Sequence, residues 1–179
     1  MRTSAIEEIR KSIQSLQNYL ESSDCSDKVY SGKQWKRQDC KALEWAAENN
    51  IRVIEEAEFL EKWIKSGKIR GGENRVYFEE DFDGLIWAVK MNELTYHQDD
   101  MAAFADRLVK SSEYFPDTTL EIIGFVKTNR GVKPLLRQPF VVTKPNVLAF
   151  PAEIWKALDE MGFKLLDPDN EIWLSPDRS

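Results

Sequence analysis

Hydrophobic positions recur at helical spacing near the start of the chain. Successive members of this stripe are three or four residues apart: Ile6, Ile9, Ile13, Leu16 and Leu20. Such spacing predicts an amphipathic helix, with Ser4 as its N-cap. Its apolar face needs a partner surface. We favour the rest of the chain over a second molecule, because the run is short for an independent coiled coil.

Two further helices are predicted before residue 67. The stretch from Glu21 to Gln38 is polar and is typical of a connecting loop. A helix then fits residues 39–50, with Asp39 as its cap, and another fits 55–67, ended by Gly67. Residues 1–67 are therefore expected to be a mainly helical N-terminal segment.

The pattern changes to strands after residue 67. β-Branched and aromatic residues fill 75–80 and 85–91, and the intervening "DFDG" suits a tight turn. A second hairpin is predicted over 119–142, with Gly131 in its turn. Pro134 and Pro139 lie in its return strand. Since proline cannot donate to a ladder, we expect this strand at a sheet edge or bent near Gln138.

Helices are predicted between and after these hairpins. One fits Asp99–Ser111, capped by Asp99 or Asp100, and one runs from Pro151 to Gly162, with a short last strand at 171–175. The expected fold class is α+β: a helical N-terminal segment (1–67) followed by an antiparallel sheet with helices (68–179). We expect the two parts to form one compact unit.

Composition narrows the function classes. The chain carries 31 acidic and 25 basic residues, a net charge of -6, and the acids are spread along it. This argues against broad nucleic-acid binding, which requires clustered Lys and Arg. One basic stretch, Ser31–Lys41, is interpreted as a solvated linker before a helix in preference to a nucleic-acid or partner patch.

Metal, membrane and secretion signals are weak. Cys25, Cys40 and the single His97 are too few and too scattered for a zinc site. No window has the apolar length of a membrane span, and the N-terminus lacks a signal-peptide core. We therefore expect a cytoplasmic protein with two free thiols, although one disulfide is compatible with the count. His97 favours a surface or capping role over acid–base chemistry.

Six segments, in consistent order and spacing over about the last 110 residues, resemble the kinase-like domain of polyvalent proteins, a divergent branch of the serine/threonine/tyrosine kinases of phages and conjugative elements. They are "GGENRVYF" (Gly71–Phe78), "AVK" (Ala88–Lys90), "RLVKSSEYFP" (Arg107–Pro116), "IIGF" (Ile122–Phe125), "QPFV" (Gln138–Val141) and "EIWKALDEMGF" (Glu153–Phe163). The resemblance implies the small lobe of a protein kinase and its hinge.

The resemblance also implies a nucleotide site. Gly71 and Gly72 would form a degenerate phosphate-covering loop, Lys90 would contact the phosphates, and Gln138 to Val141, with Phe140, would be the hinge that meets adenine. ATP would be the ligand, and magnesium would enter only with it. The residues alone favour plainer readings: Lys90 as a strand-end lysine that keeps an edge soluble, and the glycine pair as a helix-to-strand turn.

The carboxylate partner of Lys90 stays open. Asp106 and Glu113, on the helix expected after Asp99, are candidates, and Glu73 in the glycine turn is a third. The family's catalytic loop and metal-binding aspartate have no counterpart before Ser179, and the "DFDG" at Asp81–Gly84 comes too early to be that ligand. We therefore expect inefficient phosphoryl transfer, or none.

Three functions are open at this point. The first is a degenerate or truncated kinase-like protein that binds nucleotide and acts through binding. The second is a phage or mobile-element protein that binds and modulates a host or defence protein without nucleotide. The third is a regulatory partner of a separately encoded large lobe. A protein partner is expected in each of the last two, and nucleic acid is not.

Overall fold

The computed structural model describes residues 2–22, 31–140, 151–167 and 172–176. Its contacts divide the chain into two compact units, Met1–Phe140 and Val141–Ser179. The first unit contains α1 (Arg2–Glu21), α2 (Ser31–Glu48), β1 (Arg52–Glu55), α3 (Glu56–Lys65), β2 (Ile69–Gly71), β3 (Asn74–Glu80), β4 (Ile86–Asn92), η1 (Thr95–His97), α4 (Met101–Tyr114), η2 (Pro116–Thr118), β5 (Glu121–Thr128) and β6 (Gly131–Pro139). The second contains α5 (Pro151–Glu160), β7 (Lys164–Asp167) and β8 (Ile172–Leu174).

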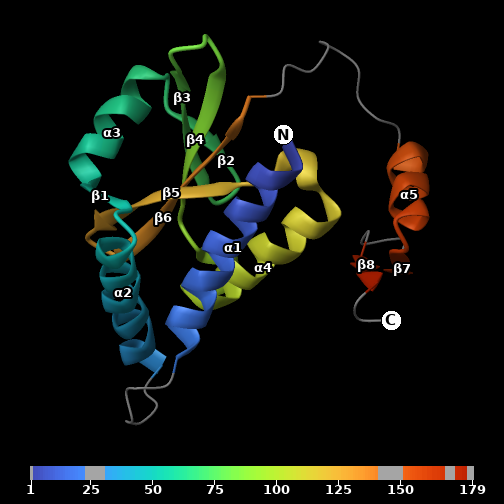
Figure 1. Cartoon of the computed structure of the whole chain (residues 1–179), viewed down its shortest axis with the longest axis horizontal. Helices are drawn as coiled ribbons and strands as arrows, with labels where there is room; N and C mark the ends of the chain where they lie inside the picture. The colour runs from blue at the N-terminus through green and yellow to red at the C-terminus, as the bar shows by residue number, and fades with distance from the viewer. Residues whose placement is uncertain (1, 23–30, 141–150, 168–171, 177–179) are drawn as a thin grey trace. The chain divides into compact units, whose positions relative to one another are not determined.

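A six-stranded sheet in the order β1-β5-β6-β4-β3-β2 organises the first unit. All neighbours are antiparallel except β1 and β5, which run parallel. The α+β class and the antiparallel sheet with helices are confirmed (Figure 1). The strand β1 was not predicted, so the mainly helical first 67 residues also contribute an edge strand to the sheet.

The edge position expected for the proline-containing strand is wrong. β6 is an interior strand, bonded to β5 on one side and to β4 on the other. Its prolines nevertheless avoid the doubly bonded part: Pro134 precedes Leu135, the last residue that pairs with β4, and Pro139 follows Arg137, the last that pairs with β5. Each proline has a neighbouring strand on one side only. The missing N–H therefore does not interrupt hydrogen bonding where β6 is paired on both sides.

Helices cover both faces of the sheet (Figure 1). On one face, α3 packs Phe59 against Tyr77 of β3, with ring centroids 5.5 Å apart. On the other face, α1, α2 and α4 form the larger core cluster, in which Trp45 of α2 meets Phe125 of β5 edge-on at 6.3 Å. α1 therefore packs on the chain itself, as expected, and its contact with α4 is the most extensive between helices.

The two N-terminal helices begin earlier than predicted. α1 starts at Arg2, so Ser4 lies inside it and not at its cap. α2 starts at Ser31, so residues 31–38 of the predicted loop, together with the whole predicted linker Ser31–Lys41, are helix. Lys41, at the end of that basic stretch, is buried and donates to the backbone oxygens of Leu20 and Ser22. It therefore caps the C-terminus of α1.

α2 is also tied to the rest of the unit by two side chains in its middle. The Gln38 side chain accepts from the Met101 amide at 2.8 Å and donates to Asp100, the N-cap of α4, at 3.0 Å. Asp39, expected to cap this helix, instead accepts from the Val132 amide of β6 at 2.9 Å. The predicted cap of α4 by Asp100 is confirmed, since its carboxylate accepts from the Ala103 amide.

The second unit contains the predicted helix and last strand. α5 begins at Pro151 and the chain turns at Gly162, whose φ is +83°. β8 pairs with β7 in a two-stranded antiparallel sheet. β7 was not predicted as a strand. No residue of this unit whose side chain the structure describes is fully buried.

Candidate functional site

Lys90 lies in the middle of β4, between Val76 of β3 and Leu136 of β6. Its side chain is half-buried, and its ammonium donates to the Gln138 side-chain oxygen at 3.0 Å. Burial lowers the pKa of Lys90 from its usual value. Among the described residues, this charge is balanced only by a neutral amide oxygen, so the lysine can offer its proton donors to an anionic ligand.

An apolar surface adjoins Lys90 on the same face of the sheet. Alternation along β4 places Ala88 beside Lys90, and Ala88 pairs with Phe78 on one side and Gln138 on the other. Phe140 follows β6 and contacts Phe78, with ring centroids 4.9 Å apart. These rings are 38% and 41% exposed, which leaves their faces available to a planar ligand.

The glycine turn lies at the other end of β4. Gly71 pairs with Asn74, and Asn74 pairs with Asn92, two residues beyond Lys90. Gly72 is left-handed, with φ +51°, and a Cβ added to it would lie 3.8 Å from the Tyr96 ring. Along β4 the predicted site residues thus follow one another in the order glycine turn, Lys90, Gln138 and Phe140. Val141, the last hinge position, lies outside the described residues.

None of the three proposed carboxylates pairs with Lys90. Asp106 forms an ion pair with Lys110 at 2.9 Å, one helical turn away. Glu113 is exposed in the last turn of α4. Glu73 accepts from the Asn92 side chain and from the Tyr96 amide, both at 3.0 Å. Among the described residues, the partner of Lys90 is therefore Gln138, from the hinge end of the site.

Glu73 also fixes the glycine turn. Besides its side-chain bonds, its backbone oxygen accepts from the Glu93 amide at 2.8 Å. The side chain of His97 is 10% exposed, lies 3.9 Å from the Glu73 carboxylate and packs on Phe104. His97 is thus only partly exposed, and its role stays a prediction. The turn is attached to the segment that leads into α4.

Phe78 and Ala88 are site residues that the sequence reasoning did not single out. Both lie within segments that carry the family resemblance. Period-two alternation from Lys90 would have placed Ala88 on its face. Phe78 needed the register of the hairpin, in which it pairs with Ala88.

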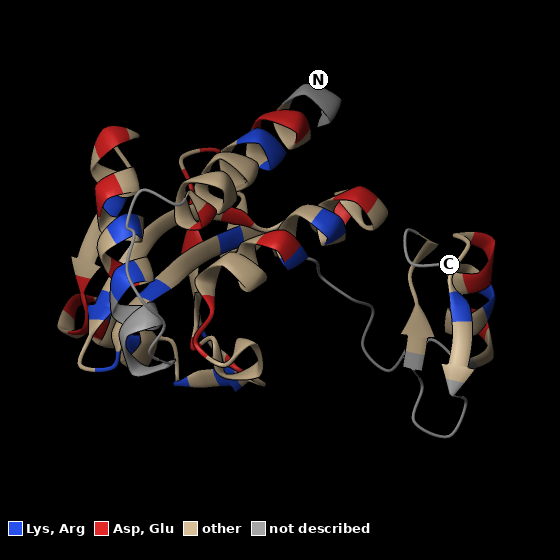
Figure 2. Cartoon of the chain, turned by 90° about the horizontal axis from the view of Figure 1, so that it is seen from below, with Lys and Arg blue, Asp and Glu red and all other residues tan. Residues whose placement is uncertain are grey.

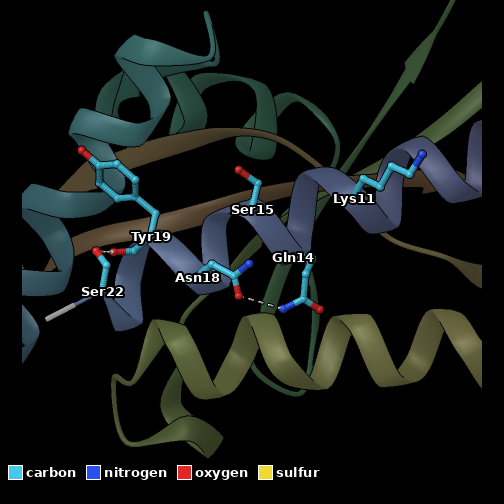
Figure 3. Close-up of a pocket in the computed structure, with 6 residues that line it drawn as sticks. All are labelled: Lys11, Gln14, Ser15, Asn18, Tyr19 and Ser22. Atoms are coloured by element: carbon cyan, nitrogen blue, oxygen red, sulfur yellow. Dashed lines mark hydrogen bonds between the residues drawn. The ribbon is translucent and has the colours of Figure 1, made fainter.

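A cavity of about 520 Å³ lies elsewhere, along α1. It is lined by Lys11, Gln14, Ser15, Asn18, Tyr19 and Ser22. Figure 3 shows Gln14 and Asn18 joined by a hydrogen bond of 3.1 Å along the helix. None of the residues expected to bind nucleotide lines this cavity.

Charge is mixed over the molecule. Figure 2 shows Lys and Arg interspersed with Asp and Glu on the same helices and strands. Within the described ranges, no group of three His, Cys, Asp or Glu residues could hold a metal ion. Cys40 is exposed and free, whereas Cys25 lies outside the described residues. No helix in the described part of the chain is long and apolar enough to cross a membrane.

Comparison with known protein families gives one match. A family model described as a serine/threonine/tyrosine kinase found in polyvalent proteins matches residues 36–176. The matched range includes every residue of the candidate site and begins within α2. Comparisons with curated proteins and with solved structures find no significant match.

Proposed function

Since the chain belongs to the serine/threonine/tyrosine kinases found in polyvalent proteins, we propose that it binds ATP on the Lys90 face of the sheet and acts through binding. Lys90 would contact the phosphates, Gly71 and Gly72 would cover them, and the Phe140 end would meet the adenine. Magnesium would enter with the nucleotide and supply charge neutralisation at its phosphates.

The order of residues along β4 carries this proposal. In kinases the glycine-rich loop and the strand lysine hold the phosphates, and the hinge holds the base. Here the glycine turn, the lysine and the exposed aromatic pair follow one another along β4 in that order. A half-buried cation beside exposed aromatic rings also suits the two ends of a nucleotide chemically.

The partner of Lys90 supports binding without efficient transfer. Active kinases place a carboxylate against this lysine, which positions it for the transition state. Gln138 occupies that position here and brings no negative charge. The lysine can therefore attract phosphate, but nothing among the described residues holds it as the kinase ion pair does.

Thermal unfolding with ATP, with and without magnesium, tests the site. Saturating ATP should raise Tm by several degrees, because a ligand that binds only the folded state stabilises it. Lys90→Ala should remove the shift. Lys110→Ala, which alters an exposed lysine paired with Asp106, is the matched control and should retain it. No shift of the wild-type chain at millimolar ATP rejects the nucleotide site.

Two further substitutions test which part of the site binds the phosphates and which part binds the base. Gly71→Ala adds a methyl group into open space, so it should leave the fold unchanged and weaken ATP more than adenosine. Phe140→Ala should weaken both about equally, since it removes a contact to the base. The reverse pattern would mean that the ligand lies in the opposite orientation.

The second candidate function is modulation of a host or defence protein by a phage or mobile-element protein, without nucleotide. One observation favours it: the most exposed aromatic side chain of the described residues is at the tip of a hairpin rich in acids. This function predicts no ATP shift and binding that depends on the hairpin.

A further inference from the structure

The turn that joins β3 and β4 has an unusual composition. Between residues 76 and 89 the chain carries four acids, Glu79, Glu80, Asp81 and Asp83, and no Lys or Arg. At its tip, Phe82 is fully exposed. The hairpin projects away from α1, α2 and α4 (Figure 1).

Hydrogen bonds hold this turn in one conformation. The Asp81 carboxylate accepts from the Asp83 amide at 3.0 Å, from the Leu85 amide at 2.9 Å and from the Trp87 ring at 2.8 Å. Gly84 takes the left-handed φ of +77° that closes the turn. Phe82 is thus presented on a fixed turn, so a partner that buries it loses little backbone entropy.

Apolar and acidic groups are exposed together around Phe82. Leu85 and Ile86 are 45% and 42% exposed. Glu79 is paired with Lys62 at 2.5 Å, whereas Glu80 and Asp83 are exposed and form no ion pair with a described residue. An exposed aromatic ring, Phe82, thus lies beside exposed aliphatic side chains. Around them are carboxylates that have no ion-pair partner among the described residues. We call Glu80–Ile86 the hairpin tip.

We propose that the hairpin tip docks into an apolar pocket bordered by Lys or Arg on another protein. Aromatic anchors in pockets carry much of the energy of protein interfaces, and charge of one sign selects a partner surface of the opposite sign. The same acids disfavour nucleic acid and anionic membranes. They also disfavour pairing with the tip of a second copy, because a two-fold contact would bring like charges together.

The probe is a random peptide library displayed on phage, selected against the immobilised full chain. Enriched peptides should combine Lys or Arg with aromatic or aliphatic residues, and their affinity should fall as salt rises. Phe82→Ala should lower the affinity for these peptides roughly thirtyfold, the loss typical of an interface hot spot. Because the Phe82 side chain is fully exposed in the free chain, its removal should leave the Tm of the variant at the wild-type value.

Charge reversal supplies a second measurement. Glu80→Lys combined with Asp83→Lys should abolish binding of the basic peptides while leaving Tm nearly unchanged. Ile64→Ala removes another exposed apolar side chain, 53% exposed on α3, and should have no effect on the peptides.

Several results would overturn the proposal: no enriched peptide, equal binding to Phe82→Ala, a pool of acidic or uncharged peptides, or self-association of the chain that Phe82→Ala abolishes. The outcome is independent of the nucleotide site. Phe82→Ala should leave the ATP shift intact, and Lys90→Ala should leave peptide binding intact.

Discussion

At the scale of single residues, Lys90 is a charge that the fold accommodates at a cost. Burial lowers the pKa of its ammonium, and Gln138 offers only a neutral acceptor. At any pH below that lowered pKa, the amine is protonated in both states and the folded state bears the desolvation cost. As pH rises from the folded to the unfolded pKa, the unfolded chain holds more protons, and stability increases. A residue that costs stability is a candidate for function.

Lys90→Met should therefore raise the free energy of unfolding at neutral pH while abolishing the ATP shift. The thioether keeps the volume of the side chain on the apolar face beside Ala88 and removes the buried charge. Urea unfolding of both proteins, near neutral pH and at high pH, measures this. The gain should shrink at high pH, where the wild-type amine is already neutral. A variant less stable at neutral pH would show that the lysine is structural.

Substitution by alanine should have different effects on stability at two glycines of the sheet, Gly124 and Gly71. A Cβ at Gly124 would lie 2.7 Å from the backbone oxygen of Arg52, so Gly124→Ala must push β1 and β5 apart. We expect a loss of about 1–3 kcal/mol, as for overpacking elsewhere. Gly71→Ala is the control, since nothing lies within 4 Å of its added methyl group. Chemical unfolding that shows equal stability for the two variants would contradict the strand pairing.

At the scale of elements, α2 connects the other parts of the first unit. Gln38 reaches the start of α4, Asp39 reaches β6 and Lys41 reaches the end of α1. Each bond satisfies a backbone group at an element terminus or turn, where no partner within the element exists. The helix thereby fixes the relative position of three elements that are distant in sequence.

Lys41→Met should lower the free energy of unfolding by about 1–3 kcal/mol, because the last carbonyls of α1 lose a buried charged donor. Lys11→Met alters an exposed lysine of α1 and should be nearly neutral. Guanidinium titration followed by circular dichroism compares them. Equal stabilities would mean that water replaces the ammonium at this helix terminus.

The pattern of the sequence predicted those elements whose stability is mainly local. The β3–β4 hairpin and α4 have their turn residues and cap within a few positions, and both were found as expected. β1 was missed because its four residues lie between two helices and its partner β5 is about seventy residues away. The first turns of α2 were missed because their sequence is polar and the helix is held by Gln38, Asp39 and Lys41.

The same division holds for the site. The family resemblance placed Lys90 and the glycine turn in one local motif, and their role in a nucleotide site stays a prediction. The partner of Lys90, Gln138, could not be predicted from the sequence. The pairing of Ala88 with Gln138, which brings it near, joins strands fifty residues apart. Each carboxylate weighed for Lys90 was closer in sequence than Gln138, and the structure gives Asp106 and Glu73 other partners.

At the scale of the whole molecule, the buried core that the described residues form lies in one unit. Both hydrophobic clusters belong to Met1–Phe140. Among the residues of Val141–Ser179 whose side chains are described, none is fully buried, so little apolar burial holds this segment together.

A fragment of residues 1–140 should thus unfold cooperatively at the Tm of the full chain, and a fragment of residues 141–179 should be unfolded by circular dichroism. Calorimetry of the full chain should accordingly show the main transition of the first unit. A fragment 1–140 that melts well below the full chain would show that the second unit stabilises the first.

The parallel pairing of β1 with β5 has a consequence during synthesis. Arg52 leaves the ribosome about seventy residues before its partner Gly124, which is roughly 4–14 s at ordinary elongation rates. Throughout that interval Val53 and Ile54 have no strand to pair with, and the apolar faces of α1 and α2 have no sheet to cover. The nascent chain therefore exposes much of its future core until β5 and β6 emerge together, and the first unit can close only when most of it has been made.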